Sequence, residues 1–398
     1  MAQRRERQRA RVLLVTHIRH LWSGSATGSV RAIRSLADYL SGSHDIDFYC
    51  TQWVRHGPDD GAHLYCGQSL LDYGLQRFRY LTGTGGQLTS RDRALLPAPS
   101  DPDVQRERRA FARHLAGHRY DVILFEYLHN HHLLDVVDRS RTRCVIDTHD
   151  LMHLRAQSYR AVGKSSALSV SREQELACLE QYDKVLAIQE AEYRMLSQCL
   201  ADRVMLVKRP AELCPLPLPG VDGGRLTLSF LASAAEHNVD AVEWFMNEVW
   251  SADLEKRYRL QVFGAVCNAL HVHGVQSGDI QLQGPVSSVA EAYRDAHLVI
   301  NPVRMGSGLK IKNIEALGFG RCVVTTPLGA QGMQGCVDHS VLVAQDSDEF
   351  RAVLLRLYDD RELLAELSSA AVEDAETLFS AASCFDQLSA WLADQASP

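Results

Sequence analysis

The sequence lacks the long apolar runs that mark membrane-spanning and secreted proteins. Its longest stretch of exclusively apolar residues is four, whereas a bilayer-spanning helix needs roughly twenty residues. We therefore expect neither a transmembrane helix nor the core of a signal peptide. The 10 cysteines include no C-x-x-C pair, the closest two being Cys322 and Cys336, which predicts reduced, mostly buried thiols. These absences predict a cytoplasmic protein without a disulfide framework.

Positive charge is also not in excess. Lys and Arg number 42 against 49 Asp and Glu, which gives a net charge of -7. A protein that holds nucleic acid by neutralising phosphates needs the opposite balance, so we exclude that class of partner. The first eleven residues nevertheless carry five arginines. Two interpretations of them stay open: a disordered tail, or a weak contact with anionic lipid at the inner face of the membrane.

Several signatures of catalysis are missing. The chain has no G-x-x-x-x-G-K-[ST] motif and no Ser or Cys nucleophile elbow, which excludes P-loop chemistry and that form of acyl transfer. D-x-D patterns at residues 101–103 and 45–47 lie in a polar loop and at the head of a strand, and we interpret both as chance. His129, His131 and His132 have no carboxylate or cysteine at ligand spacing. We expect no metal site and no cofactor.

The chain does contain a repeated alternation of short apolar runs with amphipathic stretches. This pattern is typical of βαβ units and a parallel sheet, and 398 residues with 46% hydrophobic composition are enough for two domains with cores of their own. Residues 12–15 predict a strand, followed by a polar loop with Gly24 and Gly28 and then a helix over residues 30–40. We predict further strands at residues 46–50, 122–125, 144–146, 185–188, 204–207, 226–232, 260–263, 280–282, 298–300, 322–325 and 341–344.

Prolines 210, 215, 217 and 219 interrupt this alternation and predict a linker, because proline cannot donate to a sheet or to a helix interior. The predicted fold class is therefore α/β, with two doubly wound domains. Ligands of open α/β sheets bind outside the carboxyl ends of the strands, so we expect the site in a cleft between the domains. The predicted organisation is a basic tail (1–11), an N-terminal domain (12–207), the linker (208–225), a C-terminal domain (226–375) and a C-terminal helix that packs back on the N-terminal domain (376–398).

The most informative stretch is Asn301–Gly320, NPVRMGSGLKIKNIEALGFG. It leaves a predicted strand, turns through Gly306, Ser307 and Gly308, and enters a helix. The N-terminus of a helix presents unsatisfied backbone N–H groups and the positive end of the helix dipole, which together favour a phosphate group. The alternative is that the two glycines only make a tight turn.

Charged side chains accompany this helix start. Lys310 and Lys312 would add positive charge beside a bound diphosphate, and Glu315, one turn further on, could accept hydrogen bonds from ribose hydroxyls. The spacing therefore suits a nucleoside diphosphate. The alternative, that both lysines are simply solvated, stays open on spacing alone.

The same segment resembles the donor-binding signature of retaining family 4 glycosyltransferases with the GT-B fold, in the subgroup P-x-x-x-G-S-G-L-K-I-K-x-x-E-A-L-x-x-G. Residues 230–245 (FLASAAEHNVDAVEWF), 283–293 and 321–335 are similar, in the same order, to the flanking segments of that family. The resemblance covers about 150 residues of the C-terminal half well and the N-terminal half loosely. It implies a nucleotide-sugar donor bound by Gly284, Val286, Arg304, Gly306, Ser307, Gly308, Leu309, Lys310, Lys312 and Glu315.

The chain departs from the family at two places. Many members carry a glutamate eight positions before the residue that matches Glu315, where this chain has Ser307, a difference shared by the G-S-G subgroup. The basic pair near the first C-terminal strand is also missing, since residues 230–236 contain no Lys or Arg. The resemblance then implies that the departing diphosphate is stabilised by Lys310, Lys312 and Arg304.

In the N-terminal half the candidate segment is Cys144–Arg155, CVIDTHDLMHLR, a strand followed by a loop. His149 resembles the strand-end histidine that faces the reacting sugar in this family, with Asp150 beside it. A retaining transfer develops oxocarbenium-like charge at the anomeric carbon, and a nearby imidazole can orient the sugar. A strand-end histidine bonded only to its neighbours is the alternative. Gly24–Gly28 resembles, less closely, the family loop that positions acceptor or diphosphate.

These observations predict a retaining, metal-independent glycosyltransferase that moves a sugar from a nucleotide diphosphate to an acceptor hydroxyl in glycan or glycoconjugate biosynthesis. His149, Lys310 and Glu315 are the expected catalytic residues, and the base is expected near Gly284–Val286. Acceptor choice is expected within residues 50–113, the least family-like stretch. The alternatives are an inert glycosyltransferase-like partner subunit and a nucleotide-sugar epimerase of the same fold. The base, sugar, acceptor and oligomeric state stay open.

Overall fold

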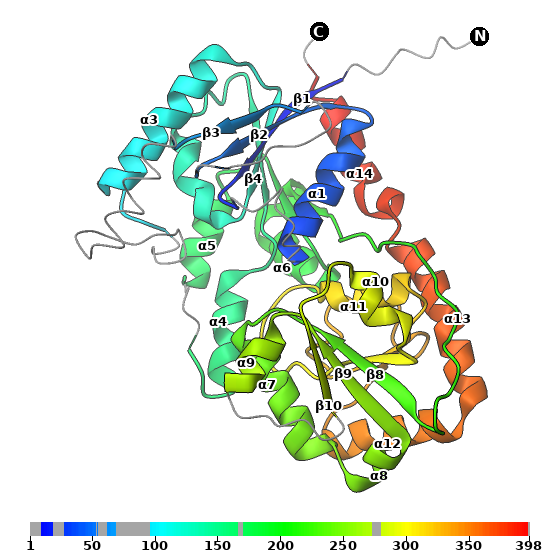
Figure 1. Ribbon diagram of the computed structural model, residues 1–398. Coiled ribbons are helices and arrows are strands. Elements are labelled where there is room, and N and C mark those ends of the chain that lie inside the picture. The colour runs from blue at the N-terminus through cyan, green and yellow to red at the C-terminus, as the bar shows by residue number, and fades with distance from the viewer. Residues whose placement is uncertain are drawn as a thin grey trace, which may run out of the picture. The chain divides into compact units, whose positions relative to one another are not determined.

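The computed structural model describes residues 9–18, 28–52, 54, 62–68, 96–165, 170–272 and 280–396. The chain divides into two compact units, each with its own parallel sheet (Figure 1). The predicted α/β class with two doubly wound domains is confirmed. The first unit comprises Met1–Ala156, Ser166–Val207 and Phe385–Pro398, and the second comprises Gln157–Ser165 and Lys208–Cys384.

The first unit contains a seven-stranded sheet in the order β3-β2-β1-β4-β5-β6-β7, with parallel neighbours throughout. The predicted apolar runs lie within one or two residues of the observed strands, because parallel strands buried on both faces are continuously apolar. Strand β3 was not predicted; its sequence, LYC, is only partly buried at the sheet edge. The strands are β1 (Arg11–Thr16), β2 (Asp45–Cys50), β3 (Leu64–Cys66), β4 (Val122–Glu126), β5 (Arg143–Asp147), β6 (Lys184–Ala187) and β7 (Val204–Leu206).

Helices connect these strands, as parallel pairing requires. Asp101 accepts hydrogen bonds from the amides of Asp103 and Val104 at the start of α3. The first D-x-D pattern is thus a helix cap rather than the polar loop that we predicted. The helices that lie wholly in this unit are α1 (Gly28–Ser41), α3 (Pro102–Gly117), α5 (Arg172–Leu179) and α6 (Glu190–Leu200), with 3-10 turns η2 (Leu128–Val136) and η3 (Ala201–Arg203).

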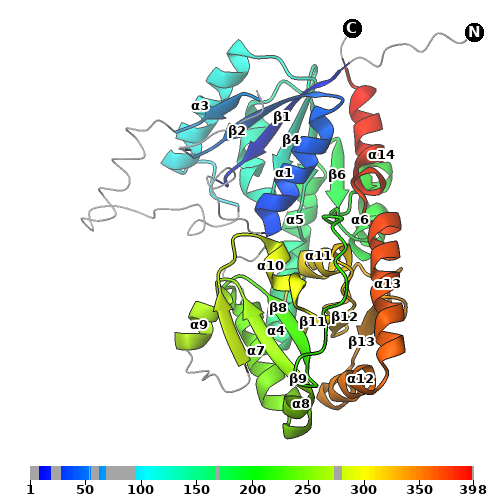
Figure 2. The same ribbon diagram turned by 45° about the vertical axis from the view of Figure 1, so that its right-hand side comes forward.

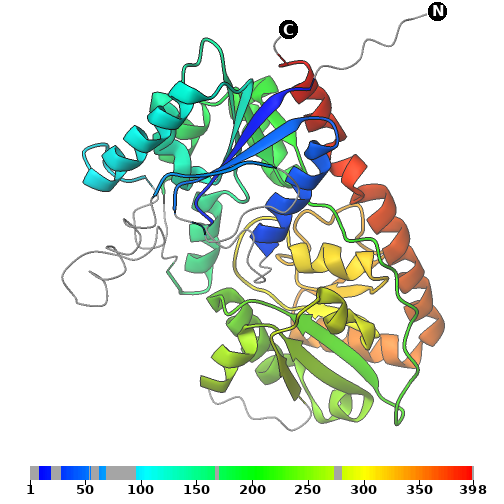
Figure 3. The same ribbon diagram turned by 45° about the horizontal axis from the view of Figure 1, so that its top comes forward.

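The second unit contains a six-stranded sheet in the order β10-β9-β8-β11-β12-β13, again with parallel neighbours. Helices α7 and α9 lie on one side of this sheet and α11 and α13 on the other (Figures 2 and 3). The strands are β8 (Leu226–Leu231), β9 (Tyr258–Phe263), β10 (Ile280–Gly284), β11 (Leu298–Asn301), β12 (Val323–Thr325) and β13 (Val341–Val343). The helices are α7 (Glu236–Trp244), π-helical η4 (Phe245–Val249), α8 (Ala252–Arg257), α9 (Val266–Val272), α10 (Val289–Arg294), α11 (Ile311–Gly318), α12 (Ser347–Asp359) and α13 (Arg361–Leu378).

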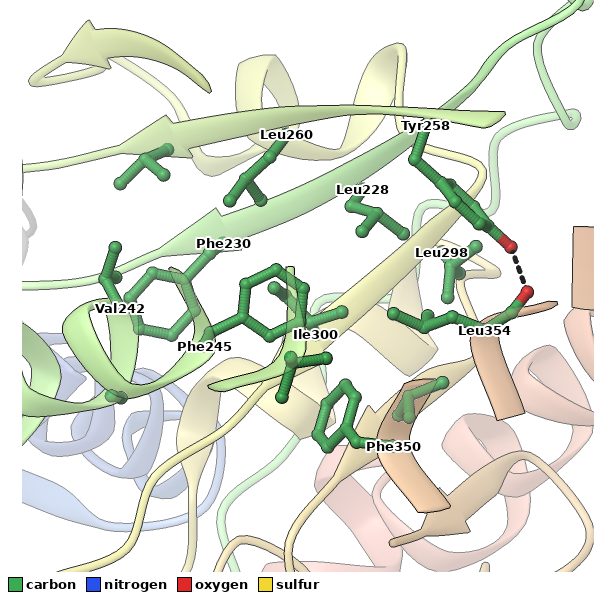
Figure 4. Close-up of a cluster of buried hydrophobic side chains, with 14 of the residues drawn as sticks. Leu228, Phe230, Val242, Phe245, Tyr258, Leu260, Leu298, Ile300, Phe350 and Leu354 are labelled. Carbon is green, nitrogen blue, oxygen red and sulfur yellow. Dashed lines mark hydrogen bonds between the residues drawn. The ribbon is translucent and has the colours of Figure 1, made fainter. Parts of the chain in front are cut away.

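The core of the second unit joins the sheet to η4 and α12 (Figure 4). Phe230 of β8 and Ile300 of β11 are buried together with Phe245 and Phe350. Complete burial of one such side chain stabilises the fold by roughly 1.5–3 kcal/mol. Tyr258 adds a polar contact, because its hydroxyl donates to the Leu354 carbonyl at 2.6 Å. This packing fixes β8 and β11 side by side at the centre of the sheet.

The two ends of the chain differ in part from the predictions. The predicted tail 1–11 ends too late, since Ala10 is fully buried and Arg11 begins β1; residues 1–8 lie outside the described ranges. The predicted helix 376–398 is the end of α13 followed by α14 (Ala381–Ala393). Helix α14 lies beside α1 (Figures 1 and 2), and Tyr39 and Ser43 of this region hydrogen-bond to it.

No helix in the described ranges combines the length and the apolar character needed to cross a membrane.

The proline-bearing segment 208–225 is attached to the second unit along its length. The Arg321 side chain, which is fully buried, donates to the carbonyls of Leu216 at 2.8 Å and Pro217 at 2.9 Å. A third bond runs from Arg321 Nε to the Tyr293 carbonyl at 3.0 Å. Burial lowers the pKa of Arg321 to about 10, so the guanidinium stays charged at neutral pH. One buried cation thus satisfies carbonyls that the prolines leave outside regular structure.

Arg321→Met is expected to destabilise the second unit, because it removes the donor of three backbone carbonyls, among them the buried carbonyl of Tyr293. An unsatisfied buried polar group costs about 1–3 kcal/mol, so we expect a lower melting temperature in calorimetry. Arg356→Met, at an exposed position on α12, is the matched control. Equal melting temperatures for the two variants would contradict the anchoring role of Arg321.

Candidate functional site

The order of strands in the second sheet places two loops together at its carboxyl edge. The strand order reverses at β8 and β11: later strands are added outward from β8 on one side and from β11 on the other. These two parallel strands pair through Leu228 with Leu298 and Ser229 with Val299. The connections that leave these two strands therefore diverge, and open α/β sheets bind ligands at such a reversal. The loop after β11, residues 302–310, is hereafter the donor loop, and the connection after β8 is residues 232–235.

A buried polar network holds the base of the donor loop. Asn301 Nδ2 donates to Asn313 Oδ1 at 2.8 Å, and Asn313 Nδ2 donates to the Gly329 carbonyl at 2.9 Å. Thr325 Oγ1 donates to the Asn301 carbonyl at 2.7 Å. Because Asn301, Asn313 and Thr325 are all fully buried, this network ties the end of β11 to α11 and β12.

The turn of the donor loop requires glycine at two positions. Gly306 has a φ of 111° and Gly308 a φ of 71°, both in the region that L-residues rarely adopt. A Cβ added at Gly306 would meet no atom within 4 Å, so backbone conformation alone accounts for glycine there. Ser307 between them is half-buried and Leu309 buried. The G-S-G-L part of the motif is thus explained by local geometry.

Lys310 occupies the N-cap position of α11, and no side chain caps this helix. Its ammonium group instead turns back on the donor loop, where it donates to the carbonyls of Gly308 at 2.7 Å and Ser307 at 3.2 Å. The positive charge of Lys310 and the free N–H groups of the first turn of α11 are therefore both located at the start of this helix. This arrangement suits a diphosphate, as predicted.

Lys312 links α11 to α7 and β8. Its Nζ donates to Asn238 Oδ1 at 2.7 Å and lies 4.3 Å from the centre of the Phe230 ring. Burial, with a smaller effect from nearby Lys310, lowers the pKa of Lys312 to about 7. The side chain therefore changes charge in the physiological range.

Glu315 lies on the buried side of α11 with 5% of its surface exposed. The Tyr293 hydroxyl lies 3.5 Å from Glu315 Oε2 and donates to the Lys312 carbonyl at 3.3 Å. Tyr293 in turn stacks on Phe319, with ring centres 5.1 Å apart. Glu315 is thus a carboxylate held in a fixed place one turn into the helix, as the motif predicts.

Arg304 is already engaged by a carboxylate. Its guanidinium contacts Asp240 Oδ1 at 2.9 Å and Oδ2 at 3.2 Å, and it lies 5.5 Å from the centre of the Trp244 ring. A bidentate pair of this kind is geometrically specific. Arg304 therefore connects the donor loop to α7, a contact that the sequence did not indicate.

The predicted base-binding residues lie at the end of β10. Gly284 has a φ of 79°, and its carbonyl accepts from the amide of Gly264 at 2.7 Å. Val286 follows in a loop and is half-buried. The structure places no hydrogen-bonding side chain at either position, which is consistent with recognition through backbone groups.

In the first unit, two carboxylates and a histidine meet at the carboxyl edge of the sheet. Glu126 and Asp147 end the neighbouring strands β4 and β5, where they are direct partners in the register, and both are fully buried. His149 Nε2 lies 2.5 Å from Glu126 Oε2, and the His149 amide donates to Asp147 Oδ1 at 3.2 Å. His149 is thus the strand-end histidine of the prediction, held by a carboxylate that sequence reasoning missed.

Two residues of this cluster have unusual backbone conformations. Tyr127 has a φ of 65° and His149 a φ of 58°, and their rings stack with centres 3.8 Å apart and planes 7° apart. A left-handed conformation in a residue other than glycine costs of order 1–3 kcal/mol and persists where the surroundings enforce it. Such strain is concentrated at functional sites, so it favours a role beyond packing for this pair.

The surroundings of the pair connect it to α1. The Tyr127 hydroxyl donates a hydrogen bond to Ser29 Oγ at 2.5 Å. Ser29 follows Gly28, which begins α1.

Other polar residues near this cluster have partners or states of their own. Burial lowers the pKa of nearby His129 to about 4, so that imidazole is neutral at pH 7. Asp150 lies 3.6 Å from Arg155 Nη1. The predicted Gly24 lies outside the described residues.

Glu126, Asp147 and His149 are also, among the residues that the structure describes, a group whose ligand atoms lie within 4.8 Å of one another. Oxygen and imidazole ligands in this number suit a divalent cation. Hydrogen bonds within the group engage His149 Nε2 and one oxygen of each acid, and the absence of a metal stays a prediction. The signal in the sequence was an acid directly after each of two apolar runs, VILFE and CVID.

Comparisons with known proteins agree with this geometry. Residues 225–360 match the family described as Glycosyl transferases group 1. No curated protein sequence matches the chain closely enough to count as a relative.

Several solved structures share the fold. Sucrose-phosphate synthase from Thermosynechococcus elongatus matches with a TM-score of 0.69 at 14% identity, covering 96% of this chain and 98% of that one. HepE from Anabaena, solved in complex with UDP and glucose, matches with a TM-score of 0.63 at 14% identity, covering 96% and 99%. A TarM variant from S. aureus in complex with fondaparinux, α-GlcNAc-glycerol and UDP matches with a TM-score of 0.67 at 9% identity, covering 96% and 100%.

The matched residues 225–360 include β8, the donor loop and α11, which are the elements that build the candidate donor site. The chain therefore shares the two-domain α/β fold of GT-B glycosyltransferases, and residues 225–360 of its second unit match the family described as Glycosyl transferases group 1.

Proposed function

We propose that the chain is a retaining, metal-independent glycosyltransferase that transfers a sugar from a uridine diphosphate sugar to an acceptor hydroxyl. The reaction would serve the biosynthesis of a glycan or glycoconjugate. The observation that carries this proposal is the meeting of the donor loop, the uncapped start of α11 and two lysines at the strand reversal of the second sheet. HepE and TarM were solved with UDP, which supports uridine as the base.

In this proposal the donor loop and α11 hold the leaving diphosphate. Both lysines lie at the helix start, where Lys310 donates to the loop carbonyls and Lys312 donates to Asn238. The bond between the anomeric carbon and the diphosphate oxygen breaks as negative charge grows on the diphosphate, the acceptor oxygen bonds to the anomeric carbon, and the acceptor proton passes to the departing diphosphate. Fixed cations and helix N–H groups stabilise that charge without reorganisation, which is an efficient source of catalysis. Glu315 accepts from the ribose hydroxyls.

From the resemblance of residues 144–155 to the family, we further propose that His149 orients the transferred sugar. Glu126 fixes the imidazole at Nε2, and the Tyr127 ring stacks against its face. A ring that is held in advance loses little entropy when substrate binds and can be placed accurately beside the anomeric carbon, where oxocarbenium-like charge develops. Glu126 is thus a positioning residue for His149.

The retaining outcome rests on the resemblance of residues 301–320 to retaining enzymes, and the anomeric configuration of the product, read by proton NMR, tests it. Metal independence is supported by the number of cations beside the donor loop, namely Arg304, Lys310 and Lys312. No observation on the described residues favours the inert-partner or epimerase alternatives. A cytoplasmic location and a membrane contact through the N-terminal arginines stay predictions.

Glu315→Ala is expected to remove UDP binding while the fold stays intact, because ribose loses its carboxylate partner. UDP at 100 times its dissociation constant stabilises a protein by roughly 2.7 kcal/mol, which moves the melting temperature by several degrees. The measurement is thermal unfolding of wild type and variant with UDP, GDP, dTDP and ADP, repeated in EDTA. Glu366→Ala, at an exposed position on α13, is the control. An equal UDP shift in Glu315→Ala refutes the ribose assignment, and a shift that EDTA removes refutes metal independence.

The affinity for UDP is expected to fall as pH rises from 7 to 9. Lys312 has a pKa of about 7, so above pH 7 the free protein must take up a proton to offer the diphosphate a cation. This requirement lowers the apparent affinity by up to about tenfold per pH unit. UDP itself changes little in this range, since phosphoryl groups ionise near pH 6. Calorimetric titrations at pH 7, 8 and 9 measure the slope.

Lys312→Arg is the control for that slope, because arginine stays charged throughout. A similar slope in Lys312→Arg, or none in wild type, would show that Lys312 does not titrate at the diphosphate.

The lowered pKa of Lys312 also makes the free energy of unfolding depend on pH. Between pH 7 and 10.5 the unfolded chain keeps the Lys312 proton that the folded chain has released. Lys312 therefore makes the free energy of unfolding rise with pH in that window.

His149→Ala is expected to lower turnover by about 10²-fold or more, which is the size of effect that one positioned catalytic side chain usually has. UDP affinity is expected to change little. Glu126→Gln is expected to give a smaller loss, because the amide keeps one hydrogen bond but no longer holds a charge beside the imidazole. The release of UDP from UDP-glucose and related donors is the measurement. Wild-type turnover in His149→Ala would remove this residue from the site.

A further inference from the structure

Residues 157–165 belong by their contacts to the second unit, although the residues before and after them in the sequence belong to the first. They comprise the last turn of α4 (Met152–Ala161) and the segment that follows it. The sequence places this stretch deep in the predicted N-terminal domain. What it contacts in the second unit is the donor loop and the start of α7.

Ser158 makes the contact with the donor loop. Its Oγ accepts a hydrogen bond from the Gly306 amide at 2.9 Å. Gly306 has a φ of 111° and no neighbour that its missing side chain would touch, so side-chain packing does not hold this peptide in place. A hydrogen bond to a residue outside the loop selects one conformation among the many that glycine can adopt. Ser158 therefore sets the direction of the peptides that follow, up to the start of α11.

Lys164 and Tyr159 make the contacts with α7. Lys164 Nζ lies 3.4 Å from both Glu236 Oε1 and Asp240 Oδ1. Tyr159, which is buried, places its hydroxyl 3.2 Å from His237 Nδ1. Asp240 is the same carboxylate that binds Arg304 of the donor loop. The segment thus reaches the loop twice, directly through Ser158 and indirectly through Asp240.

The energy of the Lys164 ion pairs indicates that Lys164 acts by positioning Asp240 and not by its charge alone. The Lys164 side chain is 32% exposed, and an exposed ion pair contributes only about 0–1 kcal/mol. The side chain of Asp240 is 9% exposed and faces two cations, Arg304 and Lys164. Lys164 therefore matters mainly because it fixes the carboxylate that orients Arg304, in a region where residues 230–236 supply no cation of their own.

We propose that residues 157–165 brace the donor loop, with Ser158 and Lys164 as positioning residues for the diphosphate of the donor. The brace acts through the Gly306 amide and through the Asp240–Arg304 pair. This inference rests on the proposed function of the donor loop. It also assigns a role in donor binding to a part of the chain that lies about 140 residues before the loop in the sequence.

The contact itself is tested without ligand, by hydrogen exchange of the full chain read on peptides that cover residues 304–309. Ser158→Ala is expected to speed exchange of the Gly306 amide about fivefold, the ratio that corresponds to one lost hydrogen bond. Ser158→Thr keeps a hydroxyl and is expected to restore protection. Ser369→Ala, whose hydroxyl bonds only within α13, is the matched control. Unchanged exchange in Ser158→Ala overturns the brace.

The function of the brace is tested by calorimetric titration with UDP and with uridine. Ser158→Ala and Lys164→Met are each expected to weaken UDP about three- to tenfold, by the loss of one or two modest contacts, and to leave uridine affinity unchanged. Ser158→Thr and Lys164→Arg should bind UDP as wild type does, and Lys256→Met, an exposed lysine on α8, is the control for charge.

The outcomes separate the two proposals. Wild-type UDP affinity in both Ser158→Ala and Lys164→Met overturns the positioning role, even if hydrogen exchange shows the contact to exist. Equal losses of UDP and uridine also overturn it, because the brace acts on the diphosphate. If wild type binds neither ligand, the proposed function and the positioning role fail together, and hydrogen exchange still decides whether the contact exists.

Discussion

The pairing of β11 with β8 is the contact on which the candidate donor site depends. It places two parallel strands that are distant in sequence at the centre of the second sheet, where the strand order reverses. The connection after β8 and the donor loop after β11 consequently share one edge. Asn238 and Asp240 can then meet Lys312 and Arg304. The aromatic core beneath, around Phe230 and Phe245, keeps this register because any slip would expose apolar surface.

Charge in the second unit is arranged so that each cation near the donor loop has a local partner. Arg304 binds Asp240, Lys310 binds loop carbonyls and Lys312 binds Asn238. Only one of these partners is a carboxylate, so Lys310 and Lys312 are held by neutral oxygens rather than by ion pairs. The partners hold the cations in place before a ligand arrives, which reduces the entropy lost on binding. The lowered pKa of Lys312 is the physical cost of enclosing one of them.

The two units carry different kinds of residue at the carboxyl ends of their strands. The second unit uses glycines and cations, whereas the first uses the acids Glu126 and Asp147 with His149. Strain is present in both, at Gly306 where glycine tolerates it and at Tyr127 and His149 where ring stacking and hydrogen bonds enforce it. Segments distant in sequence contact both ends of this region: the proline segment bonds to the C-terminal end of α11, and Ser158 bonds to the donor loop.

The amino-acid sequence alone predicted the fold class, twelve of the thirteen described strands and the position of the donor motif. These features depend on local properties: continuous apolar runs, glycines in left-handed turns and the start of a helix. The sequence could not indicate Glu126, Ser158 or Asp240. Each of these residues acquires its role from a partner between 23 and 148 residues away, and an isolated Glu, Ser or Asp has no distinctive local pattern. Strand order and register are set only when the chain folds. They bring together side chains that form these hydrogen bonds and ion pairs only when they are close in space.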